Sequence, residues 1–214
     1  TPHSNSGLLL NNPHNPTGKL WTAEAILPYL DKFSLVVIDE AFMDFLTPSE
    51  EQSLIPMVRH YPNLVILRSL TKFYSMPGLR IGYAIAHRDR LQRWYHWRDP
   101  WSVNALAIAA TIGAIQDWEF QKQTWHWLAP ARSRLYDRLQ AIPGLQPLKG
   151  AANYLLVKTD TSATKLQEQL LTQHQIVIRD CISFPELGDS YFRIAVRLPS
   201  ESDRLEEAIR NIKL

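Results

Sequence analysis

Cysteine is almost absent from this 214-residue sequence, in which Cys181 stands alone. A single thiol cannot form an internal disulfide, and it cannot supply the paired C-x-x-C spacing of a structural zinc site. The seven histidines include no H-x-x-x-H pair either. We therefore expect neither a disulfide-stabilised fold nor a metal centre, and such low cysteine content is typical of a reducing compartment.

Long apolar runs and an excess of one charge are missing as well. No stretch approaches the roughly 18 residues of a membrane-spanning helix, and no basic-then-apolar leader is visible. The formal net charge is only +2, with both signs interspersed, so there is no basic footprint for nucleic acid. We expect a cytoplasmic protein whose partners include neither a membrane nor a nucleic acid.

Several catalytic motifs are also absent: there is no G-x-S-x-G elbow, no Walker loop and no G-x-G-x-x-G loop. What the sequence does contain is a series of short apolar runs that end in polar residues. The runs at 7–10, 35–38 and 64–69 lead to three sets of side chains, namely Asn15, Asp39, and Ser69 with Lys72. Open α/β sheets bind ligands at the carboxyl ends of their strands, so these side chains are candidates for one site.

Lys72 lies between Thr71 and Phe73, and Arg80 opens a further strand-like run to residue 86. Aromatic neighbours and a nearby guanidinium both favour the neutral amine, which can condense with an aldehyde. The residues alone leave open a solvated surface lysine. Because a parallel crossover needs about a dozen residues, the strands on either side of this loop are antiparallel neighbours or not neighbours at all.

The first part of the chain alternates strands and helices, which predicts a mostly parallel sheet with helices on both faces. We expect helices over residues 23–32, capped by Thr22, and over 53–60, 89–97 and 105–116. A long amphipathic stretch then runs to residue 142, where Pro130 should kink or divide the helix. Residues 1–6 are expected to form a loop.

From residue 145 the pattern becomes a compact α+β unit. We expect strands over 153–158, 176–179 and 191–196, and helices over 163–173 and 202–212, the last capped by Ser200 with Asp203. The predicted organisation is a partial large domain over residues 1–130 and a small C-terminal α+β domain over 131–214, entered by the long linking helix.

Taken in chain order, three motifs resemble the class I/II aminotransferase family of fold type I pyridoxal phosphate enzymes. They are N-P-x-N-P-T-G at 12–18, D-E-A-F at 39–42, and S-x-x-K from residue 69 with an arginine eight residues after the lysine. The resemblance covers most of the 214 residues. It implies the C-terminal part of a fold type I large domain, followed by a small α+β domain.

The resemblance also implies a role for each candidate residue. Lys72 would be the catalytic lysine that binds the cofactor, pyridoxal 5'-phosphate, covalently. Asp39 would pair with the protonated pyridine nitrogen, and Asn15 would bond the ring 3' oxygen. Ser69 and Arg80 would hold the cofactor phosphate.

The substrate ligands implied are arginines. Arg193 would bind the α-carboxylate, a task suited to a planar guanidinium that binds bidentately. Arg179 occupies a position that serves a distal phosphate in members with phosphorylated substrates, and Arg197 is a third candidate. On the residues alone each could be a solvated surface charge. Phe42 is a departure, because many members have a tyrosine there whose hydroxyl donates to the ring 3' oxygen.

Within the family the sequence is most similar to the histidinol-phosphate aminotransferase branch, and there to the threonine-phosphate decarboxylases of cobalamin biosynthesis. The implied reaction is decarboxylation of L-threonine O-3-phosphate, with transamination of a phosphorylated amino acid or amino alcohol as the alternative. Family members have an upstream phosphate loop and a ring-stacking aromatic, and they form homodimers. We therefore expect the longer protein to be a homodimeric enzyme, and this chain alone to be a non-catalytic fragment that binds cofactor weakly or not at all.

Overall fold

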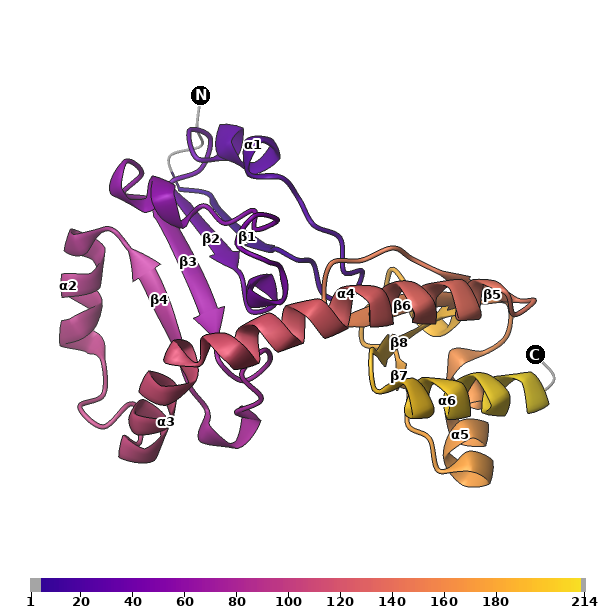
Figure 1. Cartoon of the computed structure of the whole chain (residues 1–214). Coiled ribbons are helices and arrows are strands. Elements are labelled where there is room, and N and C mark those ends of the chain that lie inside the picture. The colour runs from indigo at the N-terminus through magenta and orange to yellow at the C-terminus, as the bar shows by residue number, and fades with distance from the viewer. Residues whose placement is uncertain (1–4, 213–214) are drawn as a thin grey trace. The chain divides into compact units, whose positions relative to one another are not determined.

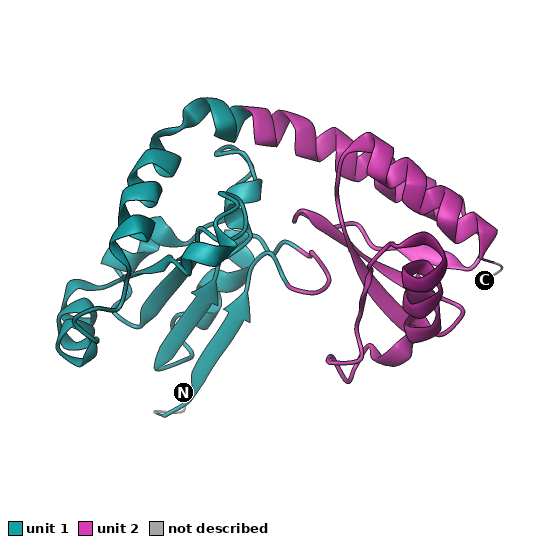
Figure 2. Cartoon of the chain, turned by 90° about the horizontal axis from the view of Figure 1, so that it is seen from below, with its two compact units in different colours: residues 1–14, 20–122 teal, residues 15–19, 123–214 magenta. Residues whose placement is uncertain are grey.

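A computed structural model describes residues 5–212 of the chain. It forms two compact units, which Figure 2 distinguishes by colour. Unit 1 takes residues 1–14 and 20–122, and unit 2 takes residues 15–19 and 123–214. The domain division expected at residue 130 stays a prediction; the short segment 15–19 clusters with the second unit. Residues 1–4 of the predicted N-terminal loop lie outside the described part of the chain.

Unit 1 is built on a four-stranded sheet in the order β1-β2-β3-β4 (Figure 1). The strands are β1 (Gly7–Asn11), β2 (Leu35–Asp39), β3 (Leu64–Ser69) and β4 (Gly82–Ala86). The first three run parallel, and β4 pairs with β3 in the antiparallel sense. The predicted mostly parallel α/β fold is confirmed, and the two strands that flank the Lys72 loop are antiparallel neighbours.

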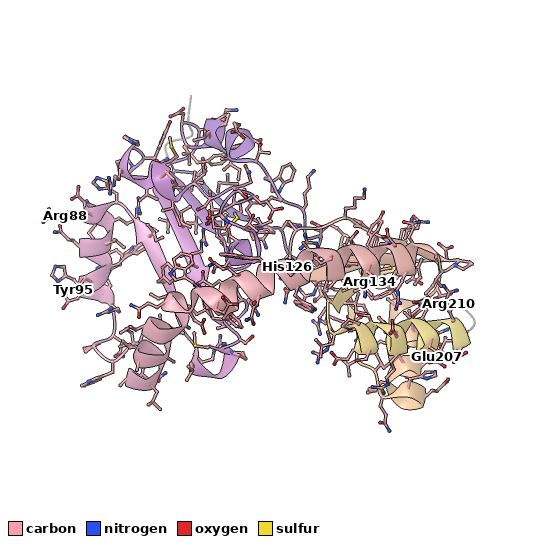
Figure 3. The ribbon with its side chains drawn as sticks, viewed as in Figure 1. Arg88, Tyr95, His126, Arg134, Glu207 and Arg210 are labelled. Atoms are coloured by element: carbon pink, nitrogen blue, oxygen red, sulfur yellow. The ribbon has the colours of Figure 1, made fainter. Side chains whose placement is uncertain are left out.

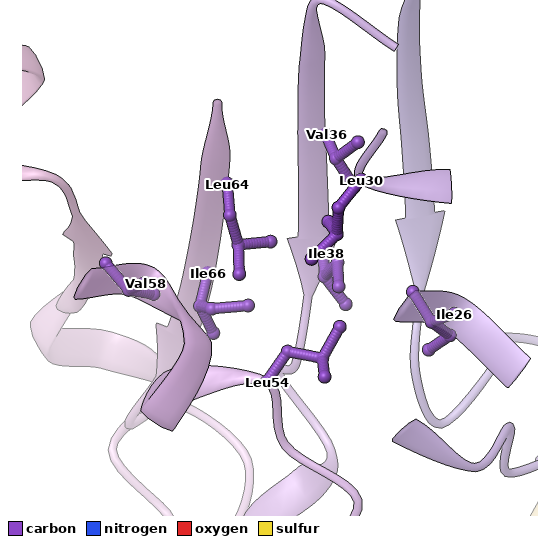
Figure 4. Close-up of a cluster of buried hydrophobic side chains, with 8 residues drawn as sticks. All are labelled: Ile26, Leu30, Val36, Ile38, Leu54, Val58, Leu64 and Ile66. Atoms are coloured by element: carbon purple, nitrogen blue, oxygen red, sulfur yellow. The ribbon is translucent and has the colours of Figure 1, made fainter. Parts of the chain in front are cut away.

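One face of this sheet closes over an apolar core, shown in Figure 4. Alternate residues of β2 and β3 point to this face and meet side chains from the segments between the strands. The cluster consists of Ile26, Leu30, Val36, Ile38, Leu54, Val58, Leu64 and Ile66. On the opposite face coverage is uneven, since Val65 is buried but Leu9 of the edge strand β1 is 75% exposed.

The first predicted helix is shorter than expected. Thr22 does cap it, with its Oγ1 accepting the Ala25 N–H at 3.3 Å, but α1 spans only Ala23–Ile26. The chain continues as the 3₁₀ turn η1, Leu27–Tyr29. The prediction of one helix to residue 32 was wrong because Pro28 has no N–H to continue the α-helical ladder.

A proline explains a second correction. Residues 53–60 were predicted as a helix, but the structure has a 3₁₀ segment, η3, over Ile55–Arg59 with Pro56 at its start. Two further 3₁₀ turns, η2 (Met43–Phe45) and η4 (Pro77–Leu79), lie in the loops after β2 and β3.

Three longer helices follow β4. They are α2 (Arg88–Trp97), α3 (Ala105–Gln116) and α4 (Trp118–Gln140), close to the predicted bounds. Figure 3 shows Arg88 and Tyr95 projecting outward from α2. The helix α4 is continuous through Pro130, so the predicted division does not occur. No helix among the described residues is both long enough and apolar enough to cross a bilayer.

Unit 2 contains an antiparallel sheet in the order β5-β6-β8-β7. Its strands are β5 (Leu145–Pro147), β6 (Tyr154–Thr159), β7 (Arg179–Asp180) and β8 (Tyr191–Ala195). The strand predicted at 176–179 was wrong in extent, because only Arg179 and Asp180 pair with β8. The short β5 was not predicted.

Two helices complete unit 2, α5 (Ala163–His174) and α6 (Pro199–Asn211), together with the 3₁₀ turn η5 (Gly188–Ser190). The cap predicted at Ser200 was wrong. Pro199 occupies the first helical position, where its fixed φ favours helix initiation, and Glu201 Oε2 accepts the Leu198 N–H at 3.2 Å. The helix therefore begins before the residues that carried the capping prediction.

Candidate active site

Two predicted site residues lie where β2 and β3 end. Asp39 is the last residue of β2 and Ser69 the last of β3, and their side chains point to the face opposite the core cluster. The Asp39 Oδ1 accepts the Ala41 N–H at 2.9 Å. The Ser69 hydroxyl lies 2.8 Å from that of Thr71 and accepts the Thr71 N–H at 3.3 Å. A carboxylate and two hydroxyls therefore share the carboxyl edge of the parallel strands.

The loop after β3 presents Lys72. Leu70 and Phe73 are both buried and anchor the loop on either side of the lysine, while the lysine itself is exposed. The Leu70 N–H donates to the Ile81 carbonyl at 3.2 Å, which closes the base of the loop. The alternation of buried and exposed residues therefore holds the amine at the surface of unit 1.

The aromatic neighbour of the amine differs from the one the sequence suggested. Phe73 points into the core, where it packs edge-on against Phe45 and Phe120 at centroid distances of 5.3 and 5.8 Å. The Lys72 Nζ instead lies 5.9 Å from the ring centroid of Phe42, three residues after Asp39. The loops that follow β2 and β3 are thus in contact through Phe42 and Lys72. The desolvation expected of the amine is not provided by the described residues.

Arg80 ends the 3₁₀ turn η4 in the left-handed region, with φ of 51°. Its Nη1 donates to the Pro77 carbonyl at 2.8 Å. Two residues later Gly82 pairs with Ser69, and a Cβ there would lie 2.6 Å from the Arg68 carbonyl oxygen, so only glycine fits. This close approach of β4 to β3 brings Arg80 to the strand end that carries Ser69.

Asn15 belongs to unit 2, where the structure brings it together with another predicted ligand. The Nη1 of Arg193 donates to the Asn15 Oδ1. The segment is fixed by Gly18, whose carbonyl accepts the Ala151 N–H at 2.7 Å and whose φ is +73°. A Cβ on Gly18 would lie 3.0 Å from the Cα of Gly150, so the backbones meet because neither residue has a side chain.

Arg193 and Arg179 face one another across the pair of strands β8 and β7. The Arg193 guanidinium carbon lies 4.8 Å from the ring centroid of Tyr154. Burial raises the pKa of Tyr154, and the charge of Arg193 opposes that rise. Arg179 is exposed, and its Nη2 donates to the Ser183 hydroxyl at 3.4 Å.

Like charges directly opposite on neighbouring strands are destabilising. Among residues 5–212 no carboxylate forms an ion pair with either arginine of this couple, whereas Arg197 is held by Glu201, its Nη2 lying 2.7 Å from the Oε1. The Arg179–Arg193 couple therefore suits a ligand with one or two negative groups, and Arg197 is already engaged.

Sequence reasoning missed two charged residues beside the predicted ones. Glu40 follows Asp39, Arg68 precedes Ser69, and both are buried with the Arg68 Nε 2.8 Å from the Glu40 Oε2. Burial raises the pKa of Glu40, and Arg68 opposes that rise. The available indication was a carboxylate and a guanidinium at the ends of two apolar runs, since such charges are rarely buried unless paired.

Unit 1 is thus an α/β unit that carries an amine, a carboxylate, hydroxyls and a guanidinium at the strand ends of a mostly parallel sheet, where such sheets bind ligands. Comparison of the sequence with known families assigns the chain more narrowly. The family model for aminotransferase class I and II matches residues 1–212. The chain belongs to the aminotransferase class I and II family.

Three relatives illustrate the similarity. A threonine-phosphate decarboxylase of Salmonella typhimurium is 40% identical over 210 residues, covering 96% of this chain and 57% of that protein. The histidinol-phosphate aminotransferase structure from Clostridium acetobutylicum superposes with a TM-score of 0.89 at 30% identity, covering 96% of this chain and 63% of that one. A histidinol-phosphate aminotransferase from Sinorhizobium meliloti, in complex with pyridoxal-5'-phosphate, gives 0.85 at 27% identity, covering 97% and 58%. The chain therefore spans little more than half the length of these relatives.

Proposed function

We propose that the protein is a pyridoxal phosphate-dependent enzyme that decarboxylates a phosphorylated amino acid, L-threonine O-3-phosphate. The observation that carries the substrate class is the Arg179–Arg193 couple across β7 and β8. A substrate with both a carboxylate and a phosphate supplies an anion for each guanidinium and removes their mutual repulsion. The 40% identical relative with the name threonine-phosphate decarboxylase supports the same substrate.

The residues of unit 1 fit the cofactor by their chemistry. Asp39 uses only one carboxylate oxygen within the described chain, in its bond to the Ala41 N–H, so the other can accept from a protonated pyridine nitrogen. The hydroxyls of Ser69 and Thr71 and the guanidinium of Arg80 are donors suited to a phosphate. Lys72 supplies an exposed amine for a carbonyl group. Ser69, Arg80, Asp39 and Lys72 are proposed as cofactor ligands, and Asn15 of unit 2 is proposed as a further one.

When bound, the cofactor supplies an electron sink for the pair of electrons released at the substrate α-carbon. The chain's own contribution is orientation and proton handling. Asp39 keeps a proton on the ring nitrogen, and Arg193 and Arg179 fix the two ends of the substrate. For decarboxylation, Arg193 would hold the substrate carboxylate in the orientation from which it leaves.

The second candidate is an aminotransferase acting on a phosphorylated substrate. The histidinol-phosphate aminotransferase structure with a TM-score of 0.89 favours it. Both reactions need the same ligands, with Lys72 moving the proton in transamination. The chain covers only part of either relative, so the homodimer and the cytoplasmic location expected for the longer protein also stay predictions.

Borohydride trapping tests the cofactor assignment. The longer protein that contains this chain is purified, incubated with pyridoxal phosphate, reduced with borohydride and mapped by peptide mass spectrometry. Because reduction is irreversible, it collects adducts even when binding is weak, and we expect Lys72 to carry more adduct than any other lysine. Lys72→Ala should abolish this excess, whereas Lys122→Ala, at an exposed lysine of α4, serves as the matched control. Equal labelling of all exposed lysines would contradict the assignment.

Product analysis separates the two reactions in the longer protein. With L-threonine O-3-phosphate and no added keto acid, the decarboxylase should release CO2 and leave pyridoxal phosphate unchanged. An aminotransferase should instead convert the cofactor to pyridoxamine phosphate. Neither product, from a longer protein whose Lys72 is labelled preferentially, would contradict both proposed reactions on this substrate.

A further inference from the structure

A buried cluster of charges lies directly behind the candidate site in unit 1. The guanidinium of Arg68 uses each of its three nitrogens for a different carboxylate: Nε lies 2.8 Å from the Glu40 Oε2, Nη1 pairs with Asp44 and Nη2 with Glu51. Glu40 accepts two further bonds, from the Ser53 hydroxyl at 2.7 Å and from the Leu54 N–H at 3.3 Å. One guanidinium thus pairs with three carboxylates, all from the segment between β2 and β3.

These residues take no part in the proposed chemistry, and burying them is costly. Taking a guanidinium and several carboxylates out of water costs free energy, which their mutual attraction repays only with good geometry. Arg68 is 6% exposed and Glu40 is 0% exposed. Because such a cluster contributes little net stability, stability alone does not explain why these charges are buried. The position of the cluster in the chain suggests a role in ordering the site.

The cluster is interleaved with the site residues along both strands. Asp39 and Ser69 point to one face of the sheet, while Arg68 points to the other, because successive side chains of a strand alternate. Glu40 continues the pairing beyond β2, with its N–H donating to the Leu67 carbonyl at 2.8 Å. The ion pairs therefore clamp the backbone that immediately follows Asp39 onto the backbone that immediately precedes Ser69.

We propose that Arg68 is a positioning residue, whose ion pairs with Glu40, Asp44 and Glu51 hold the loop after β2 against β3. The clamp fixes the Asp39 carboxylate and the Phe42 ring relative to Ser69 and Lys72. This role rests on the proposed function, since it assigns the clamp to the same site. Arginine is required because a lysine ammonium is a point charge that cannot bond three carboxylates in one plane.

Two backbone amides report on the site without any cofactor. The Ala41 N–H donates to Asp39, and the Thr71 N–H donates to Ser69. Hydrogen exchange of these two amides, measured by NMR, therefore reports whether the Asp39 and Ser69 side chains keep their positions. In Arg68→Met the exchange of Ala41 and Thr71 should accelerate by about fivefold or more, the factor that corresponds to loss of roughly one hydrogen bond. The amides of β6 and β8 in unit 2 should not change.

Arg68→Lys keeps the charge and covers the case in which the methionine variant fails to fold. It should accelerate the same two amides by less than the methionine does. Arg138→Met is the matched control, because Arg138 pairs with Asp203 and Glu206 in unit 2 and contacts no site residue. Unchanged exchange at Ala41 and Thr71 in the lysine variant, or acceleration spread evenly over unit 1, would overturn the positioning role.

Trapping of pyridoxal phosphate at Lys72 in the longer protein forms the second arm. If wild type is labelled preferentially at Lys72, the excess should fall several-fold in both Arg68 variants and persist in Arg138→Met; an unchanged excess would also overturn the proposal. If wild type shows no preference for Lys72, the proposed function fails, while the exchange experiment still decides whether Arg68 orders the loop. The two failures are therefore distinguishable.

Discussion

The two units bury their apolar side chains to different extents. In the described part of unit 2 the exposed large apolar residues are scattered: Leu171, Val177, Ile182 and Leu198. In unit 1 they are more numerous, and many of them lie along α3 and its flanks, at Trp97, Trp101, Leu106, Ile108, Ile112, Ile115 and Trp118. The helix α3 contains no charged residue, although helices that face water normally carry a polar stripe. Several exposed apolar side chains on one helix are typical of a region that contacts other polypeptide.

The comparison shows that a buried apolar core and a polar surface are separate properties, since a unit can have the first without the second. Unit 1 has a well-packed cluster on one face of its sheet and still exposes Leu9 and α3. In the described part of unit 2 the exposed apolar residues are not gathered on one helix. Substitutions in the core should therefore destabilise either unit. Substitutions of exposed apolar residues should change self-association in unit 1 but not in unit 2.

The largest expected effect comes from the core of unit 2. Phe192 of β8 is 0% exposed, and Phe192→Ala should lower the free energy of unfolding by about 3–5 kcal/mol, since it removes buried contacts and leaves a cavity. Denaturant unfolding measures the change. Ile182→Ala, at a residue exposed in the same unit, should cost less than about 0.5 kcal/mol. Similar losses for both would mean that unit 2 is not closed as described.

A smaller effect is expected at alkaline pH in unit 1. Burial, with the nearby Asp44, raises the pKa of Tyr74 to about 12, against an ordinary value of about 10. The folded state thus holds the phenolic proton more tightly than the unfolded state. Stability should be unaffected below pH 10 or so and should fall as the pH rises towards 12.

Tyr74→Phe removes this titration. Its unfolding free energy should match that of wild type at neutral pH and decline less steeply above pH 10 or so. Chemical denaturation at a series of pH values provides the measurement. A decline as steep as that of wild type would show that Tyr74 is not the group responsible.

The smallest effect on stability, and the sharpest contrast with unit 2, is expected at α3. Ile112 is 53% exposed, so Ile112→Ser should change the unfolding free energy by no more than about 0.5 kcal/mol. Self-association, followed by analytical ultracentrifugation, should decrease because the apolar surface shrinks. Leu171→Ser on α5 is the control, and an equal decrease there would remove the distinction between the units.

Much of the fold followed from local pattern. The strands at 35–39 and 64–69 and the helix at 105–116 were predicted within a residue, because their apolar runs and flanking polar residues leave few alternatives. The errors had two causes, prolines inside predicted helices and strand pairing that depends on a distant partner. Pro28 and Pro56 turned predicted helices into 3₁₀ turns, and strand 176–179 shrank to the two residues that β8 can pair.

The candidate site also has a part that the sequence predicted and a part that it did not. Asp39, Ser69, Lys72 and Arg80 were identified from motif order, and the structure gathers them at one sheet edge. The bond between Asn15 and Arg193 and the ion pairs of Arg68 could not be predicted, because they join residues far apart in the chain. The local pattern of apolar and polar residues contains no information about such contacts.

The meeting of Gly18 and Gly150 has a consequence for the order in which the molecule can assemble. During synthesis the segment 15–19 is made more than a hundred residues before its partners Ala151 and Arg193. Contacts between such distant residues form slowly, because a long loop must close first. The segment 15–19 therefore stays without these partners until most of unit 2 has been translated, and its docking is a late step in folding.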